Sequence, residues 1–150
     1  MGERSRFIDC GPMAQRVIPM VSYEDAGRAA EWLSAAFGFE ETERFDFEGR
    51  VAHVTLELDG NVVFVGSPSP DYRSPATLAA EYESVRRMLE TPYVIDGVMV
   101  YVDDISAHLE RARAAGATVL SELEDNPSVG QRQYRAADLE GHRWMFAQAS

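Results

Sequence analysis

The sequence contains no lysine, because all fourteen of its basic residues are arginines. Chemistry that needs a lysine amine, such as Schiff-base catalysis or a phosphate-loop lysine, is therefore excluded. Cysteine is nearly absent too: with Cys10 alone, the chain can form neither an intramolecular disulfide nor a cysteine-rich zinc site. No base partner stands near Cys10 in the sequence, so we expect it to take no part in chemistry.

Long apolar segments are also missing. No window approaches the roughly 20 apolar residues of a membrane span, and the leader at residues 1–15 lacks the apolar core of a signal peptide. We therefore expect a cytoplasmic protein with no membrane partner.

Positive charge is scarce relative to negative charge. Fourteen basic residues stand against 25 acidic ones, which gives a net charge of −11. Nucleic acids and anionic membranes both need a basic face on their partner, so this balance disfavours them. A cationic ligand is compatible with it, although the main expected effect of the charge is to keep the protein soluble.

What the sequence does contain is a clear alternation of strand and helix patterns. A chain of 150 residues with 45% apolar content predicts one ordinary domain. In the first half Asp25 is placed to cap a helix and Gly38 to end it. The predicted elements there are a strand at 16–23, a helix at 24–39, and strands at 40–47, 51–58 and 62–66, with turns at 48–50 and 59–61.

A proline-rich segment separates this half from the next. Three prolines in residues 67–75 mark a linker, and residues 76–90 predict one connecting helix. The apolar stripe of that helix is Leu78, Tyr82, Val85 and Leu89. The predicted elements that follow are a strand at 96–102, a helix at 103–117 capped by Asp103 or Asp104, a strand at 118–125, a loop at 126–130, and strands at 131–138 and 142–148.

The second half repeats the first. When Asp104 is placed over Asp25, Glu110 falls on Glu31, which indicates an internal repeat of about 79 residues. The sequence therefore predicts an α+β fold of two tandem βαβββ modules, at 16–66 and 96–150, joined by residues 67–95 within a single domain at 16–150.

Three stretches of the repeat resemble the vicinal oxygen chelate superfamily: "VSYEDAGRAAEWLSAAFGF", "VMVYVDDISAHLERARAAGA" and "YRAADLEGHRW". This superfamily includes glyoxalase I, extradiol dioxygenases, fosfomycin-resistance enzymes and bleomycin-resistance proteins. The resemblance covers about residues 16–148 and is nearest to the PhnB-like or bleomycin-resistance-like branch. It implies the glyoxalase/bleomycin resistance fold, in which two modules form a curved mixed sheet around a cleft, and a homodimer.

Metal-dependent members resemble one another in placing a ligand on the first and last strand of each module. Here those positions fall on Ile18, Phe64, Gly97 and Met145. Three of these side chains have no donor atom, and a thioether is a poor ligand for the hard or borderline ions concerned. We therefore expect no metal site and no cofactor, with a divalent metal as the alternative.

The strand at 51–58 carries the weak candidates for catalysis. We expect Val54, Leu56 and Leu58 to pack under the helices, which turns His53, Thr55 and Glu57 toward the cleft. His53 and Glu57 lie about 13 Å apart along a strand, so they cannot share one metal ion. Acid–base catalysis by these two residues remains possible, and no GxSxG nucleophile motif is present.

The remaining aromatic and histidine side chains have structural interpretations. We expect His108 at the surface flank of its helix and Trp32 in the core. We expect His142 to brace the turn at Gly141, with its ring held by Asp138 or Glu140.

The predicted cleft is apolar, rich in methionine and sparsely polar. Flexible thioethers suit adaptable binding surfaces, although inward-facing methionines are also common in plain cores. Arg143 is the clear cation there and can meet a carboxylate or phosphate. The predicted cleft residues are Met20, Ser22, His53, Thr55, Glu57, Phe64, Met99, Tyr101, Tyr134 (with Arg135 as the alternative), Arg143 and Met145.

Three functions remain open. The leading hypothesis is metal-free binding of a small molecule, as in antibiotic-resistance proteins that sequester a bulky aromatic or cationic compound. The alternative is an enzyme: a metal-dependent or acid–base lyase, isomerase or dioxygenase with a rearranged site. The third is a non-catalytic interaction module.

Overall fold

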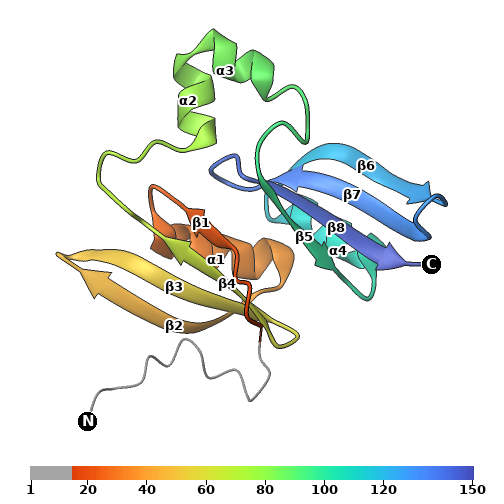
Figure 1. Ribbon diagram of the computed structural model, residues 1–150, viewed down its shortest axis with the longest axis horizontal. Coiled ribbons are helices and arrows are strands. Elements are labelled where there is room, and N and C mark those ends of the chain that lie inside the picture. The colour runs from red at the N-terminus through yellow and green to blue at the C-terminus, as the bar shows by residue number, and fades with distance from the viewer. Residues whose placement is uncertain (1–14) are drawn as a thin grey trace.

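Two four-stranded mixed sheets, each covered by a helix, make up the fold in the computed structural model, which describes residues 15–150 (Figure 1). The strand order is β1-β4-β3-β2 in one sheet and β5-β8-β7-β6 in the other. The first strand of each module pairs in parallel with the last, and the other pairs are antiparallel. The predicted α+β fold of two βαβββ modules is confirmed. Cys10 lies outside the described residues.

The two modules have the same element order. The first contains β1 (Met20–Ser22), α1 (Ala26–Phe37), β2 (Glu40–Phe47), β3 (Arg50–Leu58) and β4 (Asn61–Gly66). The second contains β5 (Gly97–Tyr101), α4 (Ile105–Ala114), β6 (Thr118–Asn126), β7 (Gln131–Ala137) and β8 (Arg143–Ala149).

Equivalent aspartates begin the two module helices. The Asp25 carboxylate accepts a hydrogen bond from the Arg28 amide at 3.0 Å, and the Asp104 carboxylate accepts one from the Ala107 amide at 3.1 Å. Each satisfies an amide that the first helical turn leaves unpaired. Gly38, at φ 84°, ends α1 in the left-handed conformation that glycine adopts without strain. The predicted cap Asp25 is confirmed, and of the two aspartates predicted for the second helix, Asp104 is the cap and Asp103 is not.

A single hydrophobic core spans both modules. Val54 and Leu56 on β3 are fully buried against it, as the alternation of that strand predicts. Trp32 packs on the same core, and its indole N–H donates to the Ala115 carbonyl of the other module at 2.8 Å. The side chain of Arg111 donates to the Ala35 carbonyl at 2.8 Å. These contacts join α1 to α4, so the helices of the two modules are bonded directly to each other.

The connecting segment differs from the single helix predicted at 76–90. It forms two short helices, α2 (Pro75–Glu81) and α3 (Glu83–Met88), separated by extended Tyr82 at φ −123° and ψ 119°. The two ends are held by different modules. Ser74, the cap of α2, donates to Glu24 at 2.6 Å, whereas the Leu89 carbonyl after α3 accepts from Arg143 at 2.8 Å.

The first strand is shorter than predicted. Only Met20–Ser22 of the predicted strand at 16–23 pairs with β4. Pro19 has no amide to donate, but its carbonyl still accepts from Phe64 at 3.0 Å, just before the ladder begins. None of the helices in residues 15–150 is both long and apolar enough to cross a bilayer.

Candidate functional site

The open faces of the two sheets, opposite the helices, carry equivalent rows of side chains. Residues that pair directly across neighbouring strands project from the same face of a sheet. In the first module one such row is Met20, Phe64 and Thr55. The equivalent row of the second module is Met99, Met145 and Arg135. The internal repeat therefore places two methionine-containing surfaces in matching positions.

Large apolar side chains on these faces are unusually exposed. Met20 is 81% exposed, Met99 46% and Tyr101 60%, whereas Val54 and Leu56 on the helix-covered side are fully buried. Exposed clusters of this kind mark places where a ligand or another protein binds. The open faces are thus the part of the fold available for recognition.

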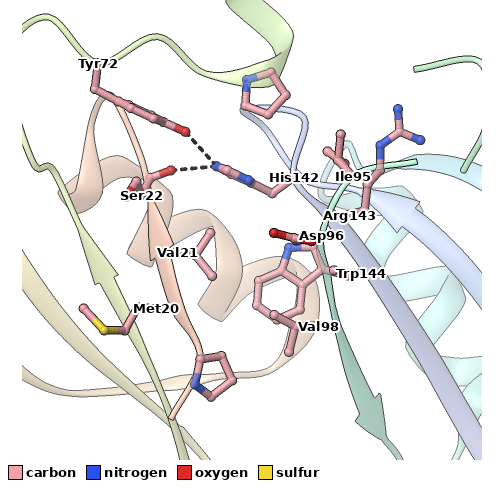
Figure 2. A pocket seen from close by; sticks show the side chains of 13 residues that line it. Met20, Val21, Ser22, Tyr72, Ile95, Asp96, Val98, His142, Arg143 and Trp144 are labelled. Carbon is pink, nitrogen blue, oxygen red and sulfur yellow. Dashed lines mark hydrogen bonds between the residues drawn. The ribbon is translucent and has the colours of Figure 1, made fainter. Parts of the chain in front are cut away.

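A cavity of 460 Å³ lies between β1 and β5, where the modules meet (Figure 2). We call it the junction cavity. Three predicted cleft residues line it: Met20, Ser22 and Arg143. The rest of its wall is Pro19, Val21, Tyr72, Pro75, Ile95, Asp96, Gly97, Val98, His142 and Trp144.

His142 closes one side of the junction cavity, and the predicted partners of its ring are wrong. Its Nε2 lies 2.6 Å from the Ser22 carbonyl oxygen and 3.4 Å from the Tyr72 hydroxyl (Figure 2). Asp138 instead accepts a hydrogen bond from the His142 main-chain amide at 3.0 Å. The ring therefore reaches the other module, where it bonds to Ser22 of β1 and lies 4.8 Å from the buried ring of Tyr23.

A second cavity, of 280 Å³, lies on the open face of the second sheet, beneath the segment that follows α3. We call it the arginine cavity because Arg135 and Arg143 both line it. Tyr93 lies over Arg135, with the guanidinium carbon 6.0 Å from the ring centre. The remaining wall is Pro92, Ile95, Gly97, Val98, Met99, Trp144 and Met145. The two cavities share several residues of β5 and β8, on which they border.

Tyr134 does not face the cleft, so its predicted place is wrong. It is 1% exposed, and its hydroxyl lies 2.5 Å from His108 Nδ1. The core packing of Tyr134 against Phe146 turns Arg135, the alternative residue, to the open face. Side chains alternate along a strand, so only one of these two neighbours can line the cleft.

His108 is also misplaced by the sequence prediction, because it lies between the modules rather than at a surface flank. Its ring stacks on Phe37 of α1, and Nε2 lies 3.1 Å from the Phe37 carbonyl oxygen. Burial lowers the pKa of His108. A histidine on one helix is thus covered by the helix of the other module.

The catalytic candidates on β3 are not gathered into a catalytic group. His53 Nε2 lies 3.0 Å from the Thr55 hydroxyl, and the His53 ring meets Phe64 edge-on at 4.8 Å. Burial lowers the pKa of His53. Glu57 lies opposite Val62. None of these side chains borders the junction cavity or the arginine cavity.

The side chains at the expected metal positions do not fit a divalent ion. The Cα partner of Phe64 on β1 is Met20, and that of Met145 on β5 is Met99. Ile18 and Gly97 lie two residues earlier in the chain than these partners. The only donors in the whole set are thioether sulfurs, which hard or borderline ions bind poorly. Across residues 15–150, no three His, Cys, Asp or Glu side chains cluster closely enough to hold a metal.

The match to known proteins agrees with this architecture. The sequence profile of the Glyoxalase/Bleomycin resistance protein/Dioxygenase superfamily matches residues 17–146. The chain belongs to that superfamily. Among solved structures, TioX from Micromonospora sp. ML1 is 31% identical with a TM-score of 0.66, and the match covers 91% of this chain and 97% of TioX.

Two further proteins are also similar to the chain. The uncharacterized protein Mb0911c of Mycobacterium bovis is 29% identical over 135 residues, which span 87% of this chain and 80% of that protein. TnmS3, an antibiotic binding protein from Streptomyces sp. CB03234, is 16% identical with a TM-score of 0.57, covering 93% of this chain and 100% of TnmS3. At that identity the likeness shows the fold alone.

The acidic turn "DLEGH" between β7 and β8 stabilises the contact between the two modules. Asp138 accepts hydrogen bonds from the buried hydroxyl of Tyr23 and, at 3.0 Å, from the indole of Trp144. Glu140 accepts the amides of Glu24 at 2.6 Å and Asp25 at 3.1 Å, and burial raises the pKa of Glu140. The two carboxylates therefore hold the second module against the start of α1.

Sequence reasoning missed the contribution of the connecting segment. Tyr72 and Pro75 line the junction cavity, and Pro92, Tyr93 and Ile95 line the arginine cavity. The prolines and aromatic residues of the predicted linker were the one feature of the sequence that could have indicated a binding role for it. Their role becomes apparent only when the segment folds back over β5.

Proposed function

We propose that the chain is a small-molecule-binding protein of the bleomycin-resistance-like kind, which holds a bulky aromatic compound in its cleft without a metal. The observation that carries this proposal is the pair of open faces with exposed methionine and aromatic side chains, next to expected metal positions whose one donor atom is the Met145 thioether sulfur. Binding by sequestration requires only shape, apolar area and a few polar contacts.

The chemistry of the cleft favours a flat, polarisable ligand. Met99 and Met145 stand side by side on the second sheet, and Met20 occupies the equivalent place on the first. Methionine sulfur makes favourable contacts with aromatic rings, and its unbranched chain adapts to irregular shapes. Tyr93 and Tyr101 add aromatic surface that is well exposed. A ring system of two or more rings is the ligand class that gains most from these contacts.

The relatives support the proposal through their described functions. TnmS3 is described as an antibiotic binding protein, and FosX from Listeria monocytogenes as a fosfomycin resistance protein, so the descriptions of two proteins with this fold concern antibiotics. Both are less than 25% identical to the chain, so they support the class of function and leave the ligand open.

We further propose that the working form is a homodimer. A single chain leaves both open faces uncovered, with Met20, Phe45, Met99 and Tyr101 all exposed. Both faces are apolar, so the first face of one copy can cover the second face of another and bury these side chains. The cleft then gains a second wall.

A thermal-shift screen of tag-free, chelator-treated protein tests the proposed function. We expect several aromatic compounds to raise Tm by a few degrees, because a ligand at about 100 times its Kd stabilises by about 2.7 kcal/mol. Met99→Ser should reduce these shifts, whereas Val129→Ser, which alters an exposed apolar residue on the β6–β7 turn, should not. A screen without any stabilising compound, or stabilisation only after divalent metal is added, contradicts the proposal.

A further inference from the structure

Arg143 is a buried cation whose charge the described part of the chain does not neutralise. The residue is only 7% exposed, yet it forms no salt bridge with any carboxylate in residues 15–150. Burial lowers its pKa, but a guanidinium stays protonated at neutral pH. The chain carries 25 acidic residues, so the missing partner does not reflect a shortage of carboxylates.

The guanidinium also has hydrogen-bonding capacity to spare. One nitrogen, Nη2, donates to the Leu89 carbonyl at 2.8 Å. The other two, Nε and Nη1, are buried and have no hydrogen-bond partner in the described structure. Buried charged donors without acceptors are costly, so a fold that keeps them gains from an acceptor supplied from outside. The Leu89 contact fixes the side chain before that acceptor arrives.

A second arginine stands on the same wall. Arg135 on β7 pairs directly with Met145 on β8. Arg143 lies two residues before Met145 on β8, so its side chain projects from the same face of the sheet. Both arginines line the arginine cavity, together with Met99 and Met145. The ring of Tyr93 lies over Arg135, with its centre 6.0 Å from the guanidinium carbon. The cavity therefore combines two positive charges with an apolar, aromatic wall.

Figure 2 shows that the Arg143 side chain extends away from Met20, Val21 and Ser22 of the junction cavity. Its charge therefore belongs to the open face of the second sheet, which is the proposed ligand-binding face.

We propose that the arginine cavity binds the acidic group of an aromatic organic anion, with Arg143 as the main contact and Arg135 beside it. This inference rests on the proposed function and specifies the charge of the ligand. Arginine donors recognise carboxylate, sulfonate and phosphate groups through charge-assisted hydrogen bonds. The wall formed by Met99, Met145 and Tyr93 takes the ring system. The overall acidity of the chain alone suggests a cation, and the local charge suggests the opposite.

Calorimetric titration with three naphthalene compounds that share one ring system and carry a negative, a neutral or a positive planar substituent tests this inference. The probes are 2-naphthoate, neutral 2-naphthamide and the cationic 2-naphthamidine. We expect 2-naphthoate to bind more tightly than 2-naphthamide by about tenfold or more, and 2-naphthamidine to bind most weakly. Inorganic sulfate alone, which has no ring, should bind much more weakly than 2-naphthoate.

Arg143→Met should remove the preference for the anion while retaining binding of 2-naphthamide. Its melting temperature without ligand should change little, because removal of an unpaired buried charge offsets the loss of the Leu89 hydrogen bond, whereas a purely structural arginine would lower Tm when replaced. Arg132→Met is the matched control. It lies on β7 with its side chain 43% exposed and paired with Asp125, and should change neither the affinity nor the preference.

The outcomes separate the inference from the proposed function. If 2-naphthamide or 2-naphthamidine binds at least as tightly as 2-naphthoate, or if Arg143→Met keeps the preference, the anion site is wrong and small-molecule binding stands. If none of the three binds and the wider screen also finds nothing, both fail. If Arg143→Met does not fold, Arg135→Met replaces it and should weaken 2-naphthoate binding severalfold without affecting 2-naphthamide.

Discussion

Among single residues, His108 best shows how the two modules depend on each other. Its two ring nitrogens are both engaged: Nδ1 lies 2.5 Å from the Tyr134 hydroxyl and Nε2 lies 3.1 Å from the Phe37 carbonyl oxygen. A neutral ring satisfies both, because Nε2–H donates to the carbonyl while Nδ1 accepts from the hydroxyl. Protonation removes that acceptor and places a charge near Arg111 in a partly buried interface.

This arrangement predicts a stability that falls in acid. Burial lowers the folded-state pKa of His108 below its ordinary value of 6.5, so the folded chain binds fewer protons than the unfolded chain in that window. The stability is therefore present above pH 6.5 and is lost as the pH falls through the lowered pKa. His108→Gln keeps one donor and one acceptor and does not titrate.

Denaturant unfolding at about pH 7.5 and pH 5.5 checks this prediction. The wild type should lose more stability on acidification than His108→Gln does. His53, whose pKa is lowered by burial too, contributes in the same direction in both proteins and so cancels in the comparison. An equal loss in both proteins would show that His108 is not the titrating group.

Sequence reasoning succeeded at residues whose role is local and failed where the partner is remote. Asp25 and Asp104 were predictable as caps because a cap bonds an amide three residues away. The burial of His108 depends on Phe37, 71 residues away in the chain. Tyr134 and Arg135 are adjacent on a strand, and only tertiary packing decides which of them enters the core.

At the scale of elements, the two caps allow a matched comparison between the modules. We expect Asp25→Ala and Asp104→Ala each to lower the free energy of unfolding by about 1 kcal/mol, because each leaves one helical amide without its acceptor. Asp103→Ala, which removes a neighbouring exposed carboxylate, should stay within about 0.5 kcal/mol of the wild type. Urea unfolding followed by circular dichroism measures all three. If Asp103→Ala lowers the free energy of unfolding as much as Asp104→Ala does, Asp104 is not the residue that caps α4.

The connecting helices show the limit of periodicity. Residues 76–90 have a helical stripe and contain neither glycine nor proline after the start, so one helix was the natural prediction. The break at Tyr82 has no local cause in the sequence. The two ends of the segment bond to different modules, Ser74 to Glu24 and Leu89 to Arg143, and such remote contacts cannot be read from helical periodicity.

At the scale of the whole molecule, the repeat made the fold predictable. Two copies of one strand–helix–strand pattern specify two similar sheets. Because the strands pair in the same register in both sheets, Met20 and Phe64 in the first have the same positions as Met99 and Met145 in the second. The cleft was less predictable, because its covering segment comes from the connection and not from the repeat. Met20, Ser22, Met99, Arg143 and Met145 line the two cavities, whereas His53, Thr55, Glu57 and Phe64 do not.

The exposed open faces predict a two-copy assembly in solution. Sedimentation equilibrium should give twice the chain mass of 16.7 kDa. Met20→Arg combined with Met99→Arg should weaken the dimer by at least about tenfold in Kd, because each introduces a charge into an apolar contact. Val129→Arg, on an exposed turn away from both faces, is the control. A wild-type protein that stays at one chain mass at high concentration would rule the dimer out.

The most direct test of metal-free binding is a calorimetric titration of chelator-treated, tag-free protein with 2-naphthoate and 2-naphthamide, repeated after addition of Zn²⁺, Mn²⁺ or Ni²⁺. We predict saturable binding of at least one compound by the metal-stripped protein, with one molecule per cleft and a Kd that added metal does not change. Binding that appears only after a metal is added, with one ion retained per chain, would contradict the account and make the metal enzyme the better description.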